Sequence, residues 1–244
     1  MATASSVDPS EIAKFSALAA EWWNPHGQFR PLHRFNPVRL AFLRETAAQH
    51  WKRDARAIRP FGGLKVLDIG CGGGLLAEPL ARMGFEVLGI DAAEDSVRAA
   101  AAHSANAGLK LNYRTAAAEE LAQSQSRFDY VLAMEVIEHV ANPEDFVATC
   151  AQLVAPGGLF VVATINRTLK SLALAKIGAE YVLRWLPRGS HDWNRFITPG
   201  ELQQYLTGAG LTISDIQGVR FDPLRWDWQL ASDTDVNYMI VAEK

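Results

Sequence analysis

Hydrophobic positions in the middle of the chain follow two alternating rhythms. Short apolar runs bounded by glycine, proline or polar clusters predict strands, and the longer segments between them carry apolar residues at helical spacing. The predicted strands cover residues 65–69, 86–90, 111–115, 128–133 and 159–165, and the predicted helices cover residues 75–83, 93–107 and 144–153. Strands that alternate with helices favour an α/β fold with a doubly wound, mostly parallel sheet and helices on both faces.

The C-terminal part of the chain adds two more predicted strands, at residues 213–221 and 236–241. The loop between them has no helical pattern, so we expect these two strands to pair antiparallel. One segment, residues 166–195, interrupts the alternation of strands and helices.

The N-terminal part carries helix signals of its own. Asp8 is a suitable helix cap, Pro9 suits the first helical position, and Glu11 completes a capping box. A second helix is expected after Pro37. We therefore interpret residues 1–60 as an N-terminal helical cap.

Composition limits the class of protein. The 244 residues are 49% hydrophobic, which suits a single domain over residues 1–244 with a sizeable core. The net charge of −3 gives no reason to expect nucleic acid as a partner. The two cysteines, Cys71 and Cys150, are far apart and have no metal-ligand spacing, which suits a reducing cytoplasm. With no signal-peptide core and no apolar run of about 20 residues, we expect a soluble protein that can still lie on a membrane.

A glycine-rich loop follows the first strand of the alternating region. It runs V-L-D-I-G-C-G-G-G from Val66, with Gly70 and Gly72 at its start, and glycines allow a ligand to approach the backbone closely. The dinucleotide fingerprint would place a third glycine at position 75, which is leucine. Asp68 would face a pyrophosphate unfavourably, whereas it suits the sulfonium and ammonium groups of S-adenosylmethionine. A purely structural turn is the alternative.

Asp91 ends the second predicted strand, 21 residues after Gly70. An acidic residue about 20 residues beyond the glycines commonly binds ribose hydroxyls. Taken alone, an aspartate after a strand is more often a helix cap, but this spacing favours ribose binding.

Several motifs together resemble a known family. The glycine loop, Asp91 and the L-V-A-P-G-G run from Leu153 are similar to the class I S-adenosylmethionine-dependent methyltransferases. The match narrows to the ubiquinone-biosynthesis O-methyltransferases through flanking motifs, which are E-I-A-K-F from Glu11, W-W from Trp22, P-L-H-R-F-N-P-V-R from Pro31, M-E-V-I-E-H-V from Met134, G-A-E-Y from Gly178 and D-V-N-Y-M from Asp235.

This resemblance implies a Rossmann-like, seven-stranded sheet whose last strand is antiparallel. It also implies O-methylation of catechol-type hydroxyls on a polyprenylated ring, at two steps of ubiquinone biosynthesis. A quinone-biosynthesis complex would be a natural partner. Two alternatives remain open: a methyltransferase for another small acceptor, and a non-catalytic, membrane-associated scaffold that binds S-adenosylmethionine.

The resemblance also implies cofactor-binding residues. Arg39, Gly70, Asp91 and Met134 would bind S-adenosylmethionine, with Arg39 facing the methionyl carboxylate and Met134 packing on the adenine or the pocket floor. Without the resemblance, Arg39 reads as a solvated helix residue and Met134 as ordinary core.

The chain departs from the family pattern after the third strand. Many methyltransferases have an acid in this turn, near the adenine amine. Here Ala117 and Ala118 offer only backbone groups, and Glu119 is the candidate substitute.

Glu135, Glu138 and His139 follow the fourth strand at spacings of three and four. If this stretch is helical, the three side chains share one face. A phenol with a pKa near ~10 needs help to lose its proton. His139, or Glu135, is a candidate catalytic base. Alternatively, all three bind a divalent cation that lowers the phenol's pKa. Mg²⁺ prefers oxygen ligands, whereas Zn²⁺ or Mn²⁺ accepts the imidazole more readily. A structural role is the third interpretation.

The interruption at residues 166–195 is basic. It holds six lysines and arginines against two acids, or +4, in a chain of net charge −3. An amphipathic pattern with aromatic residues is typical of a segment that binds anionic membrane lipids, and it also fits a lid over the active site. With a bilayer-dissolved substrate, we expect a cytoplasmic protein peripherally associated with the membrane.

Overall fold

The computed structural model describes residues 7–173, 192–223, 225 and 227–244. A central eight-stranded sheet with the order β3-β2-β1-β4-β5-β8-β6-β7 organises the chain. The pairs from β3 to β5 are parallel, and β8, β6 and β7 continue the sheet antiparallel to their neighbours. The predicted α/β fold with a mostly parallel sheet is therefore confirmed.

The strand positions agree closely with the hydrophobic pattern. The strands are β1 (Lys65–Ile69), β2 (Glu86–Asp91), β3 (Asn112–Thr115), β4 (Phe128–Met134), β5 (Val154–Ile165), β6 (Thr212–Asp222), β7 (Asp227–Ala231) and β8 (Asn237–Glu243). The prediction that the two C-terminal strands pair antiparallel is also confirmed, since β6 pairs with β8 in that direction. The expected number of seven strands is wrong because β7 forms within the loop between them.

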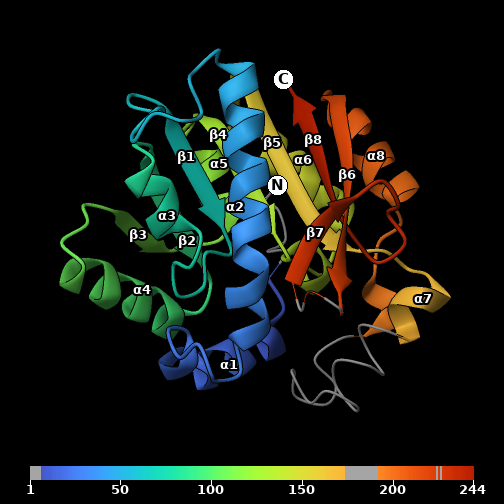
Figure 1. Cartoon of the computed structure of the whole chain (residues 1–244), viewed down its shortest axis with the longest axis horizontal. Helices are drawn as coiled ribbons and strands as arrows, with labels where there is room; N and C mark the ends of the chain where they lie inside the picture. Colours follow the sequence, from blue (N-terminus) through green and yellow to red (C-terminus); the bar gives the residue numbers. More distant parts are fainter. Residues whose placement is uncertain (1–6, 174–191, 224, 226) are drawn as a thin grey trace.

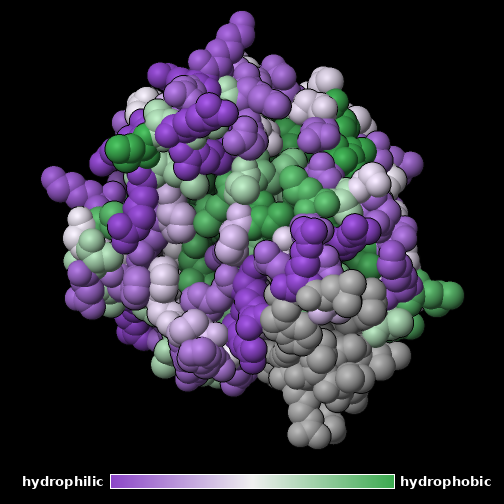
Figure 2. Space-filling view, in the orientation of Figure 1, coloured by the Kyte–Doolittle hydropathy of each residue, from purple (hydrophilic) through white to green (hydrophobic). Residues whose placement is uncertain are grey.

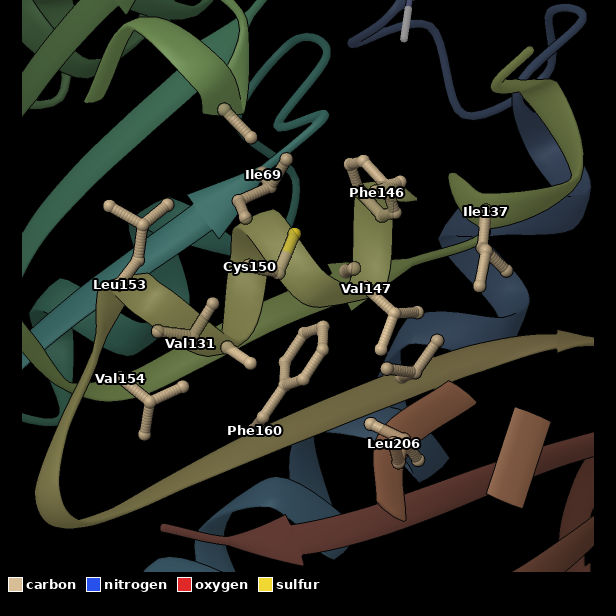
Figure 3. Close-up of a cluster of buried hydrophobic side chains, with 14 of the residues drawn as sticks. Ile69, Val131, Ile137, Phe146, Val147, Cys150, Leu153, Val154, Phe160 and Leu206 are labelled. Atoms are coloured by element: carbon tan, nitrogen blue, oxygen red, sulfur yellow. The ribbon is translucent and has the colours of Figure 1, made fainter. Parts of the chain in front are cut away.

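One face of the sheet is covered by α5 (Ala118–Gln123), α6 (Pro143–Leu153) and α8 (Pro199–Gly208). Figure 3 shows how side chains of α6, such as Phe146 and Val147, pack among residues of the strands beneath. Burial of these apolar side chains is the main force that joins the two layers.

The other face is covered by α2 (Arg30–His50) and α3 (Ala77–Arg82), whose apolar residues pack on β1, β4 and β5. In Figure 1, α2 crosses the front of the sheet, with α4 (Glu94–Asn106) near the β3 edge. Hydrophobic surface gathers in the middle of this face, around α2 (Figure 2). α2 also lies against β7, so the last strand added to the sheet is tied to the N-terminal part of the chain.

The helix α1 (Pro9–Ala17) begins as the sequence indicates. The Asp8 side chain accepts a hydrogen bond from the backbone of Ser10, and Pro9 occupies the first turn. The Glu11 carboxylate, however, faces Lys14 and His139, so the predicted use of Glu11 in a capping box is not observed. The helix lies below the carboxyl ends of the central strands (Figure 1).

The start of α2 differs from the prediction. The helix begins at Arg30 and contains Pro37 within it, whereas we expected a start after Pro37. A proline inside a helix removes a backbone hydrogen bond and crowds the preceding turn, and burial of Phe35, Phe42 and Leu43 along the helix offsets this cost.

Three short elements carry no prediction from the hydrophobic pattern: α5, α8 and β7. The helix α8 has a local signal, because the Thr198 hydroxyl and the Glu201 carboxylate form a capping box at its start. The strand β7 is five residues long and half exposed, so its pattern is too short to separate from a loop.

Candidate active site

A cavity of about 800 Å³ lies between the carboxyl ends of the strands and α1. Its volume is within the range of small-molecule sites. Crevices at this edge of an open α/β sheet are where such folds bind ligands, at the point where strand order reverses. Here the order reverses between β1 and β4, and residues following both strands line the cavity.

The glycine loop forms one wall of this cavity. Gly70 and Gly72 have φ angles of 68° and 51°, a left-handed conformation that glycine adopts without a side-chain clash. A Cβ atom on Gly70 would lie 2.4 Å from Val136, and one on Gly72 would lie 2.4 Å from the ring of Trp22. The loop therefore needs glycine at both positions for its backbone and for its neighbours.

Asp91 fixes the shape of this loop. One of its carboxylate oxygens accepts a hydrogen bond of 2.9 Å from the backbone of Gly72, and the other accepts one of 2.8 Å from Ala93. Burial raises the pKa of Asp91, and these backbone donors partly offset the rise. Asp91 lines the cavity and anchors the glycine loop, and it is not the cap of α4, whose cap position is Ala93. Ribose binding by Asp91 stays a prediction.

Asp68 and Arg39 both line the cavity, and both side chains are buried. Burial raises the pKa of Asp68 to about 7, the nearby Arg39 lowers it, and Asp91 raises it further. The Oδ2 atom of Asp68 has no hydrogen-bond partner among the described residues. A buried carboxylate that lacks a partner is costly, and a cationic group in the cavity would relieve that cost.

Arg39 is held by its own helix and by acids. Its guanidinium donates a hydrogen bond to Asn36, lies 4.6 Å from the ring centre of Phe35, and approaches the Glu135 carboxylate at 3.9 Å. Burial lowers the pKa of Arg39, and the charges of Glu135, Asp68 and Glu138 oppose that shift. The arginine therefore sits in the cavity as a counter-ion, and its Nε atom has no partner among the described residues.

The segment after β4 does not continue as an α-helix. Glu135 has a φ angle of 62°, and its N–H donates to the carbonyl of Ala163 in β5. A left-handed residue reverses the local chain direction, and only a single 3₁₀ turn, η2 (Ile137–His139), follows. The expectation that Glu135, Glu138 and His139 share one helical face is wrong for this reason.

The three side chains have separate partners. Glu135 faces Arg39, and burial together with Glu138 raises its pKa to about 7. Glu138 accepts a hydrogen bond of 2.8 Å from the buried hydroxyl of Thr164. His139 places Nδ1 3.0 Å from the Glu11 carboxylate.

The predicted divalent-cation site is not formed by this arrangement. No group of three or more metal-binding side chains occurs within residues 7–173, 192–223, 225 and 227–244. The reason is the turn at Glu135, which directs its carboxylate toward Arg39 while Glu138 faces Thr164. These residues do not fit a cation in this structure.

The remaining predicted cofactor residues lie at two other places along the cavity. Met134 ends β4 and is buried at the cavity wall. Ala118 begins α5 and lines the cavity, whereas the described lining residues do not include Glu119, which is buried in the same helix. Near the start of α5, the backbone and methyl groups of Ala117 and Ala118 border the cavity.

Glu11 and Trp22 are among the cavity residues for which the sequence predicts no role in the site. Trp22 stacks on Phe29 with 3.7 Å between ring centres, donates its ring N–H to Ser96, and packs on the glycine loop. The sequence places both residues in helices of the N-terminal cap, but their contacts join parts of the chain that only the fold brings together. In the sequence, only the resemblance to the family points to Glu11 and Trp22, because both residues belong to its motifs.

Comparisons with known proteins identify the family. The methyltransferase-domain family matches residues 40–216. A ubiquinone biosynthesis O-methyltransferase from Caulobacter sp. (strain K31) is 55% identical over 98% of this chain and 95% of its own length. A protein of the same name from Mesorhizobium japonicum is 57% identical, with 98% and 96% covered. The chain belongs to the ubiquinone biosynthesis O-methyltransferase family. The resemblance that the motifs indicate is thereby confirmed.

Solved structures confirm the fold. A magnesium protoporphyrin IX methyltransferase from Synechocystis PCC 6803, solved with bound SAH, has a TM-score of 0.65 at 18% identity, covering 95% of this chain and 94% of the other. The PH0226 protein from Pyrococcus horikoshii has a TM-score of 0.62 at 17% identity, covering 94% and 98%. At these identities the likeness concerns the fold.

The described part of the chain contains no helix with both the length and the hydropathy needed to cross a bilayer. The basic segment 166–195 is described only at its ends, because residues 174–191 lie outside the described residues. The prediction that this segment forms an amphipathic membrane-binding or lid helix therefore stays a prediction.

Proposed function

We propose that the cavity carries out S-adenosylmethionine-dependent O-methylation of a polyprenylated phenolic precursor in ubiquinone biosynthesis. Membership of the family supports the reaction class, and the described residues suit both the donor and the acceptor. The observation that carries the proposal is the buried Asp68 carboxyl beside the glycine loop, whose Oδ2 atom has no hydrogen-bond partner in the described part of the chain.

The residues fit a cationic donor with a ribose and an adenine. Asp68 would face its positive charge, Asp91 its ribose, and Ala118 its adenine, with Met134 along the side of the group. When bound, S-adenosylmethionine supplies an electrophilic methyl group. The chain's own work is to hold the acceptor oxygen in line with that group and to remove the acceptor's proton.

His139 is the residue we assign to proton removal. The Glu11 carboxylate lies 3.0 Å from Nδ1, and its negative charge favours the tautomer with the hydrogen on that atom. In the neutral ring this leaves Nε2 with a lone pair, which can accept the proton of a phenol. Glu135, a cavity residue whose pKa is raised to about 7, is the second candidate base.

The direct experiment supplies labelled S-adenosylmethionine and a set of acceptors to the purified protein. The set is a short-chain prenylated catechol, a catechol without the chain, and an unrelated amine. We expect transfer to the two catechols, and Asp68→Asn should reduce it strongly. Transfer to the amine alone would favour a different methyltransferase, and donor binding without transfer would favour a scaffold. A chelator arm in the same assay tests whether any cation contributes.

We also propose that residues 166–195 bring the protein to anionic membranes, where a polyprenylated substrate dissolves. The net charge of +4 in this segment supports this, as does Leu169, which is 78% exposed at the start of α7 (Leu169–Ser171). Sedimentation with phosphatidylglycerol vesicles should fall with added salt and with Lys176→Gln/Arg184→Gln. Salt-independent sedimentation, or an unchanged bound fraction in the variant, would contradict this. A quinone-biosynthesis complex as partner stays a prediction.

A further inference from the structure

The hairpin of β6 and β7 reaches the active-site cavity. β5 is parallel to β1 and β4, β8 is antiparallel to β5, and β6 is antiparallel to β8. The carboxyl end of β6 and the amino end of β7 therefore lie at the same edge of the sheet as the glycine loop. In the register of the hairpin, Phe221 pairs with Trp228 at this edge.

Three aromatic side chains form a continuous surface there, which we name the aromatic wall: Phe35, Phe221 and Trp228. Trp228 stacks on Phe35 with 4.6 Å between ring centres, and its edge meets Phe221 at 5.5 Å. All three line the cavity. Phe35 is buried, whereas Phe221 and Trp228 are only partly buried, and the partly exposed ring of Trp228 is the part of the wall that we expect to contact a ligand.

The aromatic wall is joined to the reaction centre but lies to one side of it. Arg39, whose guanidinium rests on Phe35, also faces Glu135 next to Met134. Along the sheet, β6 is three strands from β4. At ordinary strand spacing this corresponds to roughly 14 Å between the two backbones. A phenol ring beside Met134 would therefore direct its substituent, rather than its reacting oxygen, toward the wall.

The cavity wall also contains a charged pair. Lys170 and Asp233 line the cavity, pair with each other at 3.5 Å, and have side chains that are 51% and 41% exposed. These two partly exposed residues mark a part of the cavity that reaches the surface of the described residues. Leu169, the exposed residue at the start of α7, directly precedes Lys170.

We infer that the aromatic wall binds the first isoprenoid units of the acceptor's side chain and thereby selects prenylated acceptors over the bare ring. This inference rests on the proposed function, since it names the part of that substrate which the hairpin contacts. Apolar, unsaturated isoprenoid units suit the faces of aromatic rings, and such contacts exclude water from both partners.

The test compares acceptors that share one ring and carry zero, one or two isoprenoid units. In the wild type, kcat/KM should rise with chain length. Trp228→Ala should lower kcat/KM for the two-unit acceptor by about tenfold or more, while the bare ring changes by less than about twofold. Trp228→Phe should recover part of the preference.

Leu230→Ala is the matched control, because it removes an exposed apolar side chain from the same strand outside the cavity. It should leave the chain-length preference unchanged. The melting temperature and the affinity for S-adenosylmethionine should match the wild type in each variant. Phe221→Ala provides a second test from the neighbouring strand if Trp228→Ala is unstable.

Two results would overturn the inference: a wild-type rate that does not depend on chain length, and an equal fall for prenylated and bare acceptors in Trp228→Ala. Failure of the proposed function looks different, because no acceptor would then be methylated.

A binding experiment separates failure of the inference from failure of the proposed function. Binding of a prenylated phenol without a second hydroxyl is measured by equilibrium dialysis. If the wild type binds this phenol and Trp228→Ala binds it more weakly, the inference about the aromatic wall is supported even without turnover. Equal binding by the wild type and the variant contradicts the inference.

Discussion

The carboxylate of Glu11 in α1 lies 3.0 Å from Nδ1 of His139, which follows β4. The ring of Phe15, one helical turn further along α1, meets the imidazole edge-on at 5.6 Å between ring centres. The N-terminal helix thus sets the orientation of the residue that we assign to proton removal. Positioning of a histidine by a carboxylate also fixes which ring nitrogen carries the hydrogen.

Changing Glu11 should move the pH dependence of the reaction. Burial lowers the pKa of His139, but the hydrogen bond to Glu11 and the charges of Glu138 and Glu11 outweigh it, so the net shift is upward. A base must be neutral, so the rate rises with pH through this pKa. Glu11→Gln should lower the pKa and move the rising limb of kcat against pH to lower pH.

Lys14 provides a control of opposite sign. Its charge lowers the pKa of His139, so Lys14→Gln should move the same limb to higher pH. A limb that stays in place in both variants would show that the Glu11–His139 pair does not govern proton removal.

Removal of the imidazole should slow the reaction without loss of the donor. General-base catalysis is typically worth ~10²–10⁴-fold, so His139→Ala should lower kcat by about that factor. Its affinity for S-adenosylmethionine should stay near the wild-type value. His50→Ala, which changes a histidine bonded to the carbonyl of Gly157 on the opposite edge of the sheet, should have no such effect. An unchanged kcat in His139→Ala would show that another group removes the proton, and Glu135 would be the first residue to test.

Binding of the donor should release protons near neutral pH. The pKa of Asp68 in the free protein is raised to about 7, so this carboxyl is largely protonated at pH 6. A bound cation favours the charged form and lowers the pKa, so a proton leaves. Titration calorimetry at pH 6 in two buffers of different ionisation enthalpy measures this release. Asp68→Asn should reduce the release and weaken binding by about tenfold or more, since hydrogen bonds to charged groups are worth ~1.5–3 kcal/mol. Equal heats in the two buffers would contradict the assignment.

The glycine loop allows backbone strain to be separated from contact with Trp22. Gly63 has a φ angle of 82° and open space around it, whereas Gly72 has the same handedness and the Trp22 ring against it. Gly63→Ala should cost about 1–2 kcal/mol of unfolding free energy and leave donor binding intact. Gly72→Ala should cost more and also weaken binding, because the ring or the loop must move. If Gly63→Ala and Gly72→Ala have the same effect on unfolding free energy and the same effect on donor affinity, Trp22 does not support the loop.

The sequence predicts the sheet better than it predicts the site. The strands β1, β2, β4 and β5 contain buried apolar runs whose type follows from local pattern, and the glycine loop and Asp91 follow from ligand chemistry. The strand β7 escapes prediction because its five residues are half exposed, and its place is set by pairing with Phe221 and contact with α2. Tertiary contacts decide such an element.

The site after β4 shows the second limit of sequence-based prediction. Spacing places Glu135, Glu138 and His139 on one face only if the backbone is helical, and the left-handed residue at Glu135 breaks that condition. Its conformation is stabilised by a hydrogen bond to β5, a contact between strands. Likewise, no local rule connects Glu11 with His139, although both belong to motifs of the family.

The most direct measurement is the position of the methyl group in the product. The protein is incubated with S-adenosylmethionine labelled with ¹³C in its methyl group and a prenylated catechol, and the product is examined by carbon NMR. We expect the label in a methoxy group on the ring. Label on a ring carbon, or an unlabelled acceptor in the presence of bound donor, would contradict this expectation.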